Sequence, residues 1–274
     1  MRRLILFLLG AVFCGGGWIL AAEQRPVQLT LSSQSLDATT TFEIGFSEPM
    51  VVQKVVGKEN QKAPLVFTPA LKGSFTWLDS YRGVFVPKEP MALGTNYKIS
   101  LRKGLEKADG KPFPVQNWSE TVSTPQPMVT RAWATESMTP LDVTAHPHVA
   151  VLFNMNVTPE AAAPFVKFVN AKGGEASAHL ERATEGRFGI TLFTQGSSAP
   201  DNDLSWRDQF LQAGRAPAER TYTRANLLWV SPEKPLPVAD GWKLVVAAGL
   251  PASDEPLKLA ETANIAIGDV KPFN

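Results

Sequence analysis

Hydrophobic and polar residues alternate over short runs along most of this chain. Residues 40–46 (TTFEIGF) place Phe42, Ile44 and Phe46 on one side of an extended segment, and residues 96–101 (NYKISL) repeat the pattern. A period of two residues predicts half-buried β-strands. Proline, glycine and aspartate interrupt these runs about every 8–12 residues, a spacing typical of an all-β sandwich.

This reading predicts two series of short strands. The first series covers 27–32, 40–46, 51–56, 65–68, 73–79, 84–87, 96–101 and 118–124. The second series covers 128–133, 148–154, 165–170, 186–194, 226–230, 241–247 and 260–268. Two helical segments interrupt the second series. Thr158 and Pro159 are typical of an N-cap and a first helical position, and residues 203–214 form an amphipathic pattern that ends at Gly214.

The two series resemble each other at a fixed distance along the chain. Residues 84–105 and 228–250 match at an offset of 145, with five pairs in register: Pro90 and Pro235, Tyr97 and Trp242, Leu101 and Val246, Gly104 and Gly249, Leu105 and Leu250. Phe46 and Phe153 form an earlier pair. A period this long indicates a duplicated domain rather than a solenoid.

We therefore predict an all-β chain with two tandem Ig-like β-sandwich domains. Module 1 covers 24–125, and module 2 covers 128–270. Two prolines at 124–127 stiffen the connection between them. Module 2 carries an insertion at about 195–225, with a polar loop and a short helix that module 1 lacks.

The N-terminus has the features of a secretory signal over residues 1–22. Two arginines precede a short apolar run, and small residues ending at Ala21 and Ala22 precede a polar stretch. Cleavage is expected after Ala22, with Ala21 as the alternative site. A retained anchor is the competing interpretation, because the apolar run nearly reaches the length of a membrane span. Lipidation at Cys14 is less favoured, because Phe13 precedes the cysteine where a small residue is required.

Net charge and cysteine content exclude several classes of function. The chain is 44% hydrophobic and 19% charged, as in ordinary globular proteins. Its formal charge is +1, and removal of the signal with its two arginines brings it near −1. We therefore expect no nucleic-acid partner and no membrane contact beyond the signal. The only cysteine lies in the signal, so the processed chain is expected to have no disulfide and no thiolate chemistry.

The insertion contains the residues that we identify as a candidate partner-binding loop. They are Asp201, Asn202, Asp203, Trp206 and Arg207. Loops that a fold does not require are where binding is commonly added, and Trp206 has no counterpart in module 1, so we expect it to be exposed. The acidic group lacks the glycine and distal glutamate of an EF-hand loop. We interpret Asn202 or Asp203 as the N-cap of the following helix.

No other group of residues indicates catalysis. His146 and His148 flank a proline without a third ligand, and His179 is isolated. Glu43 and Glu48 are interpreted as an outer strand position and a turn position. No G-x-S-x-G sequence or phosphate-binding glycine loop occurs. We predict no catalytic residues, no metal and no cofactor.

Several motifs in the first series resemble the N-terminal, macroglobulin-type Ig-like modules of the bacterial alpha-2-macroglobulin family. They are a strand ending in Phe-Ser-x-Pro, a Phe-x-Pro…Gly-x-Phe-x-Trp segment and a Phe-x-Pro…Leu-x-x-Gly-Thr-x-Tyr segment. The matching residues are Phe46, Ser47, Pro49, Phe67, Pro69, Gly73, Phe75, Trp77, Phe85, Pro87, Leu93, Gly94, Thr95 and Tyr97. The resemblance is good over 40–125 and weaker over 128–270.

The resemblance implies an exported protein, in the periplasm or at the cell surface, that belongs to a protease-inhibiting scaffold. Its partners would be a protease or further macroglobulin domains. Family members trap proteases and can capture them through a Cys-x-Glu-Gln thioester, but this chain is much shorter and has no such motif. The expected role is therefore non-catalytic. The alternative is a stand-alone envelope binding or adhesion protein with the same modules. The sequence leaves the oligomeric state open.

Overall fold

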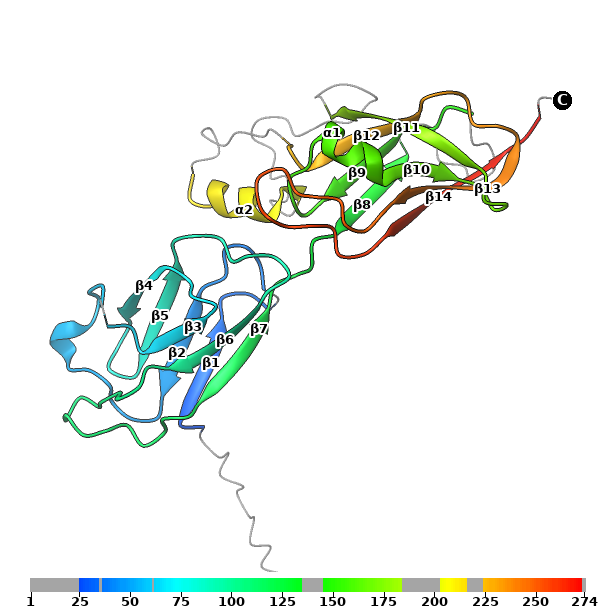
Figure 1. Cartoon of the computed structure of the whole chain (residues 1–274). Coiled ribbons are helices and arrows are strands. Elements are labelled where there is room, and N and C mark those ends of the chain that lie inside the picture. The colour runs from blue at the N-terminus through cyan, green and yellow to red at the C-terminus, as the bar shows by residue number, and fades with distance from the viewer. Residues whose placement is uncertain are drawn as a thin grey trace, which may run out of the picture.

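The computed structural model describes residues 25–34, 36–60, 62–134, 145–183, 203–215 and 224–272. Within these ranges the chain is almost entirely β-structure, arranged as two bodies joined by a short connection (Figure 1). The predicted signal, residues 1–22, lies outside the described residues and remains a prediction. The described part contains no helix with the length and apolar character of a membrane span.

Module 1 contains seven described strands in two sheets. They are β1 Val27–Leu31, β2 Phe42–Phe46, β3 Leu65–Thr68, β4 Gly73–Trp77, β5 Arg82–Pro87, β6 Asn96–Leu101 and β7 Ser119–Ser123. One antiparallel sheet has the order β1-β2-β5-β4, and the other has the order β3-β6-β7. If the strands are lettered A to G, the sheets are ABED and CFG, which is the strand order of a constant-type Ig sandwich.

Module 2 also contains seven described strands. They are β8 Val129–Ala134, β9 Val149–Phe153, β10 Val166–Val169, β11 Glu175–Arg182, β12 Leu227–Pro232, β13 Ala239–Val246 and β14 Ala263–Val270. The sheet order is β14-β13-β10-β11-β12-β9-β8. The first part of β11 pairs with β10 and its second part pairs with β12, so one strand belongs to both layers. The edge strands β8 and β14 approach each other.

The strand order confirms the Ig-like β-sandwich class predicted for both halves. Lettered in the same way, module 2 has β8-β9-β12-β11 as ABED and β10-β13-β14 as CFG, and it differs from module 1 only in the added pairing of C with D. Strands β1–β7 lie within residues 24–125, and strands β8–β14 lie within residues 128–270. The connection between D and E is four residues long in module 1, at 78–81. In module 2 the strands β11 and β12 are separated by residues 183–226, of which the structure describes 183, 203–215 and 224–226.

The matched aromatic residues at the start of strand F close the same corner in both modules. In module 1, the Tyr97 hydroxyl accepts a hydrogen bond from the backbone N–H of Ala92 at 2.9 Å. In module 2, the Trp242 indole N–H donates to the carbonyl oxygen of Pro237 at 3.1 Å. Both bonds span five residues, and both aromatic rings are buried. A hydrogen bond at this corner is a feature of Ig-type sandwiches.

The inner faces of the sheets form the core. In module 1, residues alternate between the core and solvent, as β2 illustrates with Phe42, Ile44 and Phe46 buried. Module 2 differs, because every residue of β9 and nearly every residue of β12 is buried. The second face of this strand pair carries a separate apolar cluster that consists of Ala150, Leu152, Leu227 and Trp229, with Trp133 packed against it. Continuous apolar runs are typical of strands covered on both faces.

Three local predictions have different outcomes. Residues 51–56 do not form a strand; they contain a 3-10 turn, η1, at Gln53–Val55. The predicted helical turn is confirmed as α1 Pro159–Ala162, where the Thr158 hydroxyl accepts from the Ala161 N–H at 3.1 Å, and a 3-10 turn, η2 at Ala163–Phe165, follows it. The predicted strand at 186–194 lies outside the described residues.

Candidate functional site at the inter-module joint

The described part of the insertion contains a short helix whose N-cap lies two residues after Asp203 and three after Asn202, the two predicted caps. Helix α2 covers Trp206–Gln212, and Ser205 is its N-cap, because the Ser205 hydroxyl accepts from the Asp208 N–H at 3.2 Å. Asp203, which the sequence favoured as a cap, instead has its carboxylate in ion pairs. Gly214 follows the helix with φ +86°, the left-handed conformation that commonly ends helices.

Trp206 is buried, contrary to the expectation that it is exposed. Only 5% of its surface is accessible. Its indole N–H donates to the carbonyl oxygen of Met91 in module 1 at 2.7 Å, and its backbone N–H donates to the Asn154 carbonyl oxygen in module 2 at 2.8 Å. The indole therefore reaches from module 2 to the corner between strands E and F of module 1. Burial of so large a ring is favourable once its N–H has a partner.

The connecting segment is bonded to both modules. The Gly94 N–H donates to the Pro125 carbonyl oxygen on the module 1 side at 2.7 Å. On the module 2 side, the Asn154 side-chain amide donates to the Gln126 carbonyl oxygen at 2.8 Å and accepts from the Met128 N–H at 2.8 Å. The Ala260 N–H adds a bond to the Pro127 carbonyl oxygen. The prolines were expected only to stiffen this connection, but hydrogen bonds hold it from both sides.

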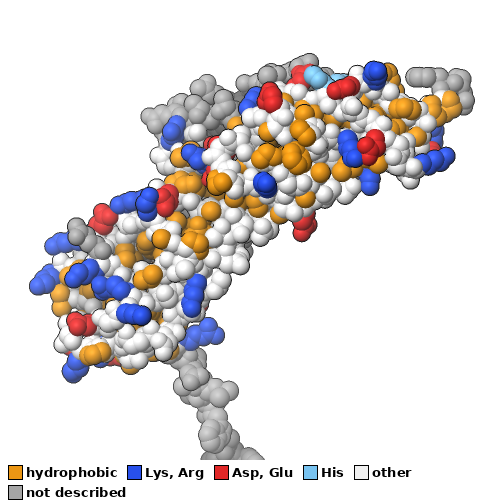
Figure 2. Space-filling view, viewed as in Figure 1, with side chains coloured by type: hydrophobic (Ala, Val, Ile, Leu, Met, Phe, Trp, Pro, Cys, Tyr) orange, Lys and Arg blue, Asp and Glu red, His pale blue; other side chains and the backbone are white. Residues whose placement is uncertain are grey.

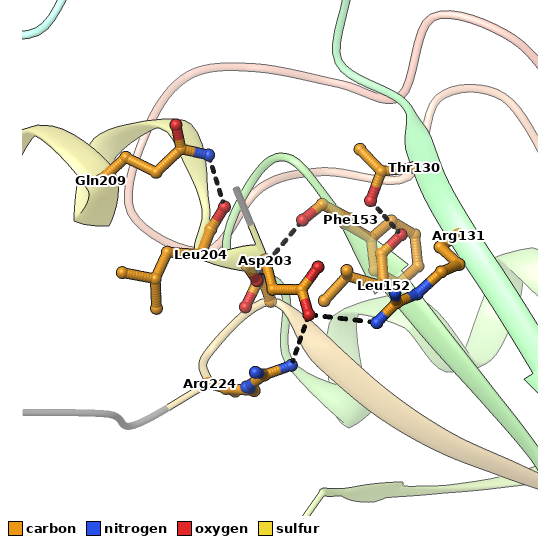
Figure 3. Close-up of polar contacts among 9 residues, drawn as sticks. Thr130, Arg131, Leu152, Phe153, Asp203, Leu204, Gln209 and Arg224 are labelled. Carbon is orange, nitrogen blue, oxygen red and sulfur yellow. Dashed lines mark hydrogen bonds and ion pairs between the residues drawn. The ribbon is translucent and has the colours of Figure 1, made fainter. Parts of the chain in front are cut away.

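Asp203, the first described residue of the insertion, is held by two arginines (Figure 3). Its Oδ2 lies 3.1 Å from a guanidinium nitrogen of Arg131 and 3.6 Å from one of Arg224. The Arg224 side chain is only 3% exposed, and its burial lowers its pKa from the ordinary value despite the attraction of Asp203. Arg131 also lies over the ring of Trp133, with 4.5 Å between the guanidinium carbon and the ring centroid.

Backbone contacts fix the position of Asp203 further. The Asn226 side-chain amide donates to the Asp203 carbonyl oxygen at 3.0 Å and to the Phe153 carbonyl oxygen at 2.7 Å. Asn226 is 1% exposed, so these bonds form in the interior. The two ends of the described insertion, near Asp203 and Asn226, are thereby joined to each other and to β9.

Arg207 lies at the other side of α2, beside the loop between β13 and β14. Its Nε is 3.7 Å from Oδ2 of Asp254, which also accepts from the Asn156 side-chain amide at 2.9 Å. Glu255 is adjacent, and burial is the main cause that raises its pKa above the ordinary value, with the negative charge of Asp254 adding to it. Asp208 contributes a further negative charge nearby. This polar contact holds α2 against module 2.

The structure therefore places the candidate loop residues in different environments. Trp206 lies in the joint, Asp203 lies between two arginines, and Arg207 is half-buried beside Asp254. Asp201 and Asn202 lie outside the described residues. The most exposed large apolar side chain on α2 is Leu211, at 45%. Asn154 and Asn226 could not be identified from the sequence, because isolated asparagines carry no motif.

Polar clusters that would suit metal or nucleophile chemistry are not apparent in the described part of the chain. Across these ranges, no three histidine, cysteine, aspartate or glutamate side chains converge as metal ligands would. His179 Nε2 lies 3.0 Å from an oxygen of Glu181, and the histidine side chain is 56% exposed on β11. Around α2, Asp203, Arg207 and the Asn226 side-chain nitrogen bond to neighbouring side chains or to backbone carbonyl oxygens. The side-chain oxygens of Asn156 and Asn226 are buried without a hydrogen-bond partner.

Comparisons with known proteins give only weak likenesses. No protein-family model matches the chain, and no curated protein matches it. Among solved structures, an alpha-2-macroglobulin fragment from Escherichia coli that spans domains MG0-NIE-MG1 is 12% identical, with 89% of this chain and 72% of that chain covered and a TM-score of 0.25. The N-terminal part of the bacterial S-layer protein SbsC is 13% identical, with 89% and 44% covered and a TM-score of 0.23.

A third similar structure is L,D-transpeptidase 3 from Mycobacterium tuberculosis. It is 16% identical, with 60% of this chain and 71% of that chain covered and a TM-score of 0.23. TM-scores of this size carry no argument about activity. The assignment of the fold therefore rests on the strand order of the two modules.

Proposed function

We propose that this chain is a non-catalytic, exported scaffold, in which two Ig-like modules are held in one orientation. Its role would resemble that of the N-terminal modules of a bacterial alpha-2-macroglobulin, as part of a protease-trapping scaffold. The observation that carries the proposal is the joint. Trp206, from the insertion of module 2, is buried with its indole N–H bonded to Met91 of module 1.

A protein that needs only a flexible tether between domains would gain nothing from such a joint. Domains within one chain commonly move relative to each other unless their contact is large and apolar. Here a buried aromatic ring crosses the boundary, and a side-chain amide, that of Asn154, fixes the connecting segment. Both devices reduce the freedom of the two modules, which supports a role in holding geometry.

The non-catalytic part of the proposal is supported by how the candidate residues are used. Asp203 is engaged by Arg131 and Arg224, and Arg207 faces Asp254. A catalytic carboxylate has to reach a substrate in a cleft, whereas these charges stabilise the attachment of α2. The chemistry of the insertion is therefore consistent with a structural role in the joint.

The alternative function, stand-alone adhesion at the envelope, is expected to use an exposed aromatic side chain in the insertion. Trp206 does not supply one, because it is 5% exposed. The described part of the insertion thus favours the scaffold over the adhesion protein.

Small-angle X-ray scattering tests the fixed orientation. A scaffold gives a single profile that one arrangement of the modules fits, and Trp206→Ala gives a profile that requires a range of inter-module angles. Leu211→Ala, an exposed change on the same helix, is the matched control and should scatter like the wild type. A wild-type profile that already requires a broad range of angles would refute the scaffold function.

The association with proteases is tested separately. Immobilised protein is incubated with a panel of purified proteases of different specificity, and the bound fraction is quantified for wild type and Trp206→Ala. Retention that depends on Trp206 supports an inhibitor scaffold. If no protease is retained, the inhibitor role is refuted, and only the role as a scaffold remains.

A further inference from the structure

Strand β1 forms one edge of its sheet, and one side of its backbone is unpaired. It pairs with β2 in the sheet order β1-β2-β5-β4 and with no described strand on its other side. Two hydrogen bonds at the ends of this pairing show which residues bond to β2. The Ser32 N–H donates to the Thr41 carbonyl oxygen at 3.1 Å, and the Ser47 N–H donates to the Pro26 carbonyl oxygen at 3.0 Å.

These two bonds determine which residues of β1 point away from β2. In an antiparallel pair, every second residue bonds to the neighbouring strand, and the residues between them direct their N–H and C=O groups outward. The bonded positions on this side are 26 and 32, so the odd-numbered residues of β1 point outward. They are Val27, Leu29 and Leu31. No described group bonds to their backbone, so the edge offers donors and acceptors at a regular two-residue spacing.

The other described edges of module 1 carry features that discourage strand pairing. Residues 57–60 cover β4 through backbone hydrogen bonds. β3 is four residues long and lies between Pro64 and Pro69. On β7, Glu120 lies opposite the buried Ile99, so its charge is on the core side of the edge. Covering segments, short strands, prolines and inward charges all protect sheet edges from further pairing.

The described edges of module 2 are irregular. The pairing of β8 with β9 shifts in register between Val129 and Arg131, and the pairing of β14 with β13 shifts at Trp242 and Lys243. Such bulges twist an edge away from a partner strand. In contrast, β1 is regular over its whole length and contains neither a charged residue nor a proline. Among the described strands, β1 is therefore the edge best suited to accept another strand.

A second copy of β1 matches this edge in the antiparallel orientation. If Leu29 lies on a two-fold axis, it faces Leu29 of the second copy, and Val27 faces Leu31. These are the residues whose backbone groups point outward, so each facing pair exchanges two hydrogen bonds. A two-fold contact uses the same surface on both copies. The counterpart of this edge is therefore the edge itself.

The side chains of β1 suit the same register. Val27, Leu29 and Leu31 lie on the core side, and the two leucines are only half-buried. The register keeps the core sides of both copies on one face of the joined sheet, so the second copy covers apolar surface of these leucines. On the outer face, Gln28 lies opposite Thr30 of the second copy, and neither residue is charged.

Charged residues just beyond the ends of β1 favour the same contact. Continued by two residues, the register places the exposed Arg25 opposite Ser33 of the second copy. The Thr40 hydroxyl lies 3.1 Å from the Ser33 hydroxyl and donates to a carboxylate oxygen of Asp37 at 3.0 Å, so this carboxylate is close to Ser33. The symmetry brings each Arg25 towards the Asp37 of the other copy. Opposite charges across a contact promote association and fix its register.

Few other charges lie near this contact in the view of Figure 2. Uncharged atoms prevail on the side of module 1 where β1 and β7 lie, and charged side chains gather on its opposite side. Repulsion between like charges of two copies is therefore small on the visible part of this surface.

We propose that two copies of this chain form a two-fold dimer through β1, which joins their β1-β2-β5-β4 sheets into one continuous antiparallel sheet. The partner is a second copy of the chain. The proposal depends neither on protease binding nor on the orientation of module 2. Because a single strand meets a single strand, the contact is small and the association is weak.

Sedimentation velocity from about 10 µM to 1 mM tests the dimer, since this range suits a weak contact. The wild type should shift from monomer to dimer and form nothing larger, because a two-fold contact is closed. The double variant Gln28→Glu, Thr30→Lys places opposite charges across the axis and should lower the Kd about 2- to 30-fold. The double variant Gln28→Lys, Thr30→Lys places lysines opposite each other and should remain monomeric. Both variants carry Thr30→Lys beside Glu43 of β2, so they differ only in the charge at position 28.

Two further variants complete the experiment. Val86→Lys changes a side chain that is 41% exposed on β5 of the same sheet, away from the edge, and should dimerise like the wild type. If circular dichroism shows that a double variant is unfolded, Arg25→Glu replaces it; this change places a negative charge near Asp37 of the other copy and should raise the Kd about 2- to 30-fold.

Three results would each overturn the proposal. The first is a wild type that stays monomeric at the highest concentration or that assembles beyond a dimer. The second is a variant with lysine at both positions that dimerises as strongly as the wild type. The third is a variant with opposite charges at the two positions that dimerises no more tightly than the wild type.

Discussion

Replacement of Trp206 by alanine should release the joint without unfolding the strands. The side chain is 5% exposed, so its loss removes nearly the full apolar area of an indole ring and its hydrogen bond to Met91. Truncation of a buried tryptophan to alanine costs about 3–5 kcal/mol. Because the indole N–H bonds to module 1, we expect part of this energy to appear as undocking of α2 rather than as unfolding.

Trp206→Phe separates the two contributions. Phenylalanine retains most of the apolar area but leaves the Met91 carbonyl oxygen without its donor, and a buried acceptor left unpaired costs about 1–3 kcal/mol. The expected order of stability is therefore wild type, Trp206→Phe and then Trp206→Ala. Leu211→Ala, on the exposed side of the same helix, should lie within about 0.5 kcal/mol of the wild type.

Urea denaturation followed by circular dichroism measures the free energy of unfolding, and limited proteolysis measures release of the insertion. Trp206→Ala should become sensitive to cleavage on either side of α2 at urea concentrations that leave the β-sheet signal unchanged. If Trp206→Ala has the same midpoint and the same cleavage pattern as the wild type, the burial of this ring contributes nothing to the joint, and the reasoning is wrong.

Three further substitutions test individual contacts. Burial and nearby negative charge raise the pKa of Glu255 in the folded state, so ionisation of Glu255 destabilises the fold as the pH rises through that pKa. The Glu255→Gln variant should therefore be more stable than the wild type at neutral pH. Below the ordinary carboxyl pKa, the denaturation curves of the two proteins should not differ. Asp203→Asn removes the carboxylate that lies between Arg131 and the buried Arg224, and should lower the free energy of unfolding by about 3 kcal/mol in urea denaturation. An unchanged denaturation curve would show that this ion pair contributes nothing to stability. Tyr97→Phe removes the acceptor of the Ala92 N–H and should lower the free energy of unfolding by about 1–3 kcal/mol, and an unchanged melting curve would show that water replaces the hydroxyl.

Most strands could be predicted from the sequence because their apolar residues alternate. The alternation in 40–46 and 96–101 follows directly from one buried and one exposed face. β11 was missed because Leu180 is its only large apolar residue; the other two inward positions carry the small residues Ala176 and Ala178, and the remaining positions are polar. Residues 51–56 misled the prediction, since a valine-rich run favours a strand even where the tertiary structure requires a turn.

The joint could not be predicted for a different reason. A tryptophan in a polar insertion has no local partner, so its sequence neighbours say nothing about its burial. Met91 lies 115 residues earlier in the chain, and only the folded arrangement of both modules brings it to Trp206. The asparagine contacts of Asn154 and Asn226 are likewise set by tertiary structure, because each uses a side-chain amide to satisfy backbone groups at the ends of strands.

The two aromatic corners differ in the direction of their hydrogen bond. In module 1 a hydroxyl accepts from the N–H of Ala92, and in module 2 an indole donates to the carbonyl of Pro237, because proline has no N–H to offer. The polarity of the corner bond is therefore reversed between the copies. A tyrosine hydroxyl can donate as well as accept, whereas an indole N–H can only donate. Tyrosine could therefore serve at either corner, because beside Pro237 its hydroxyl can donate to the carbonyl oxygen, but a tryptophan in place of Tyr97 could not accept from the Ala92 N–H.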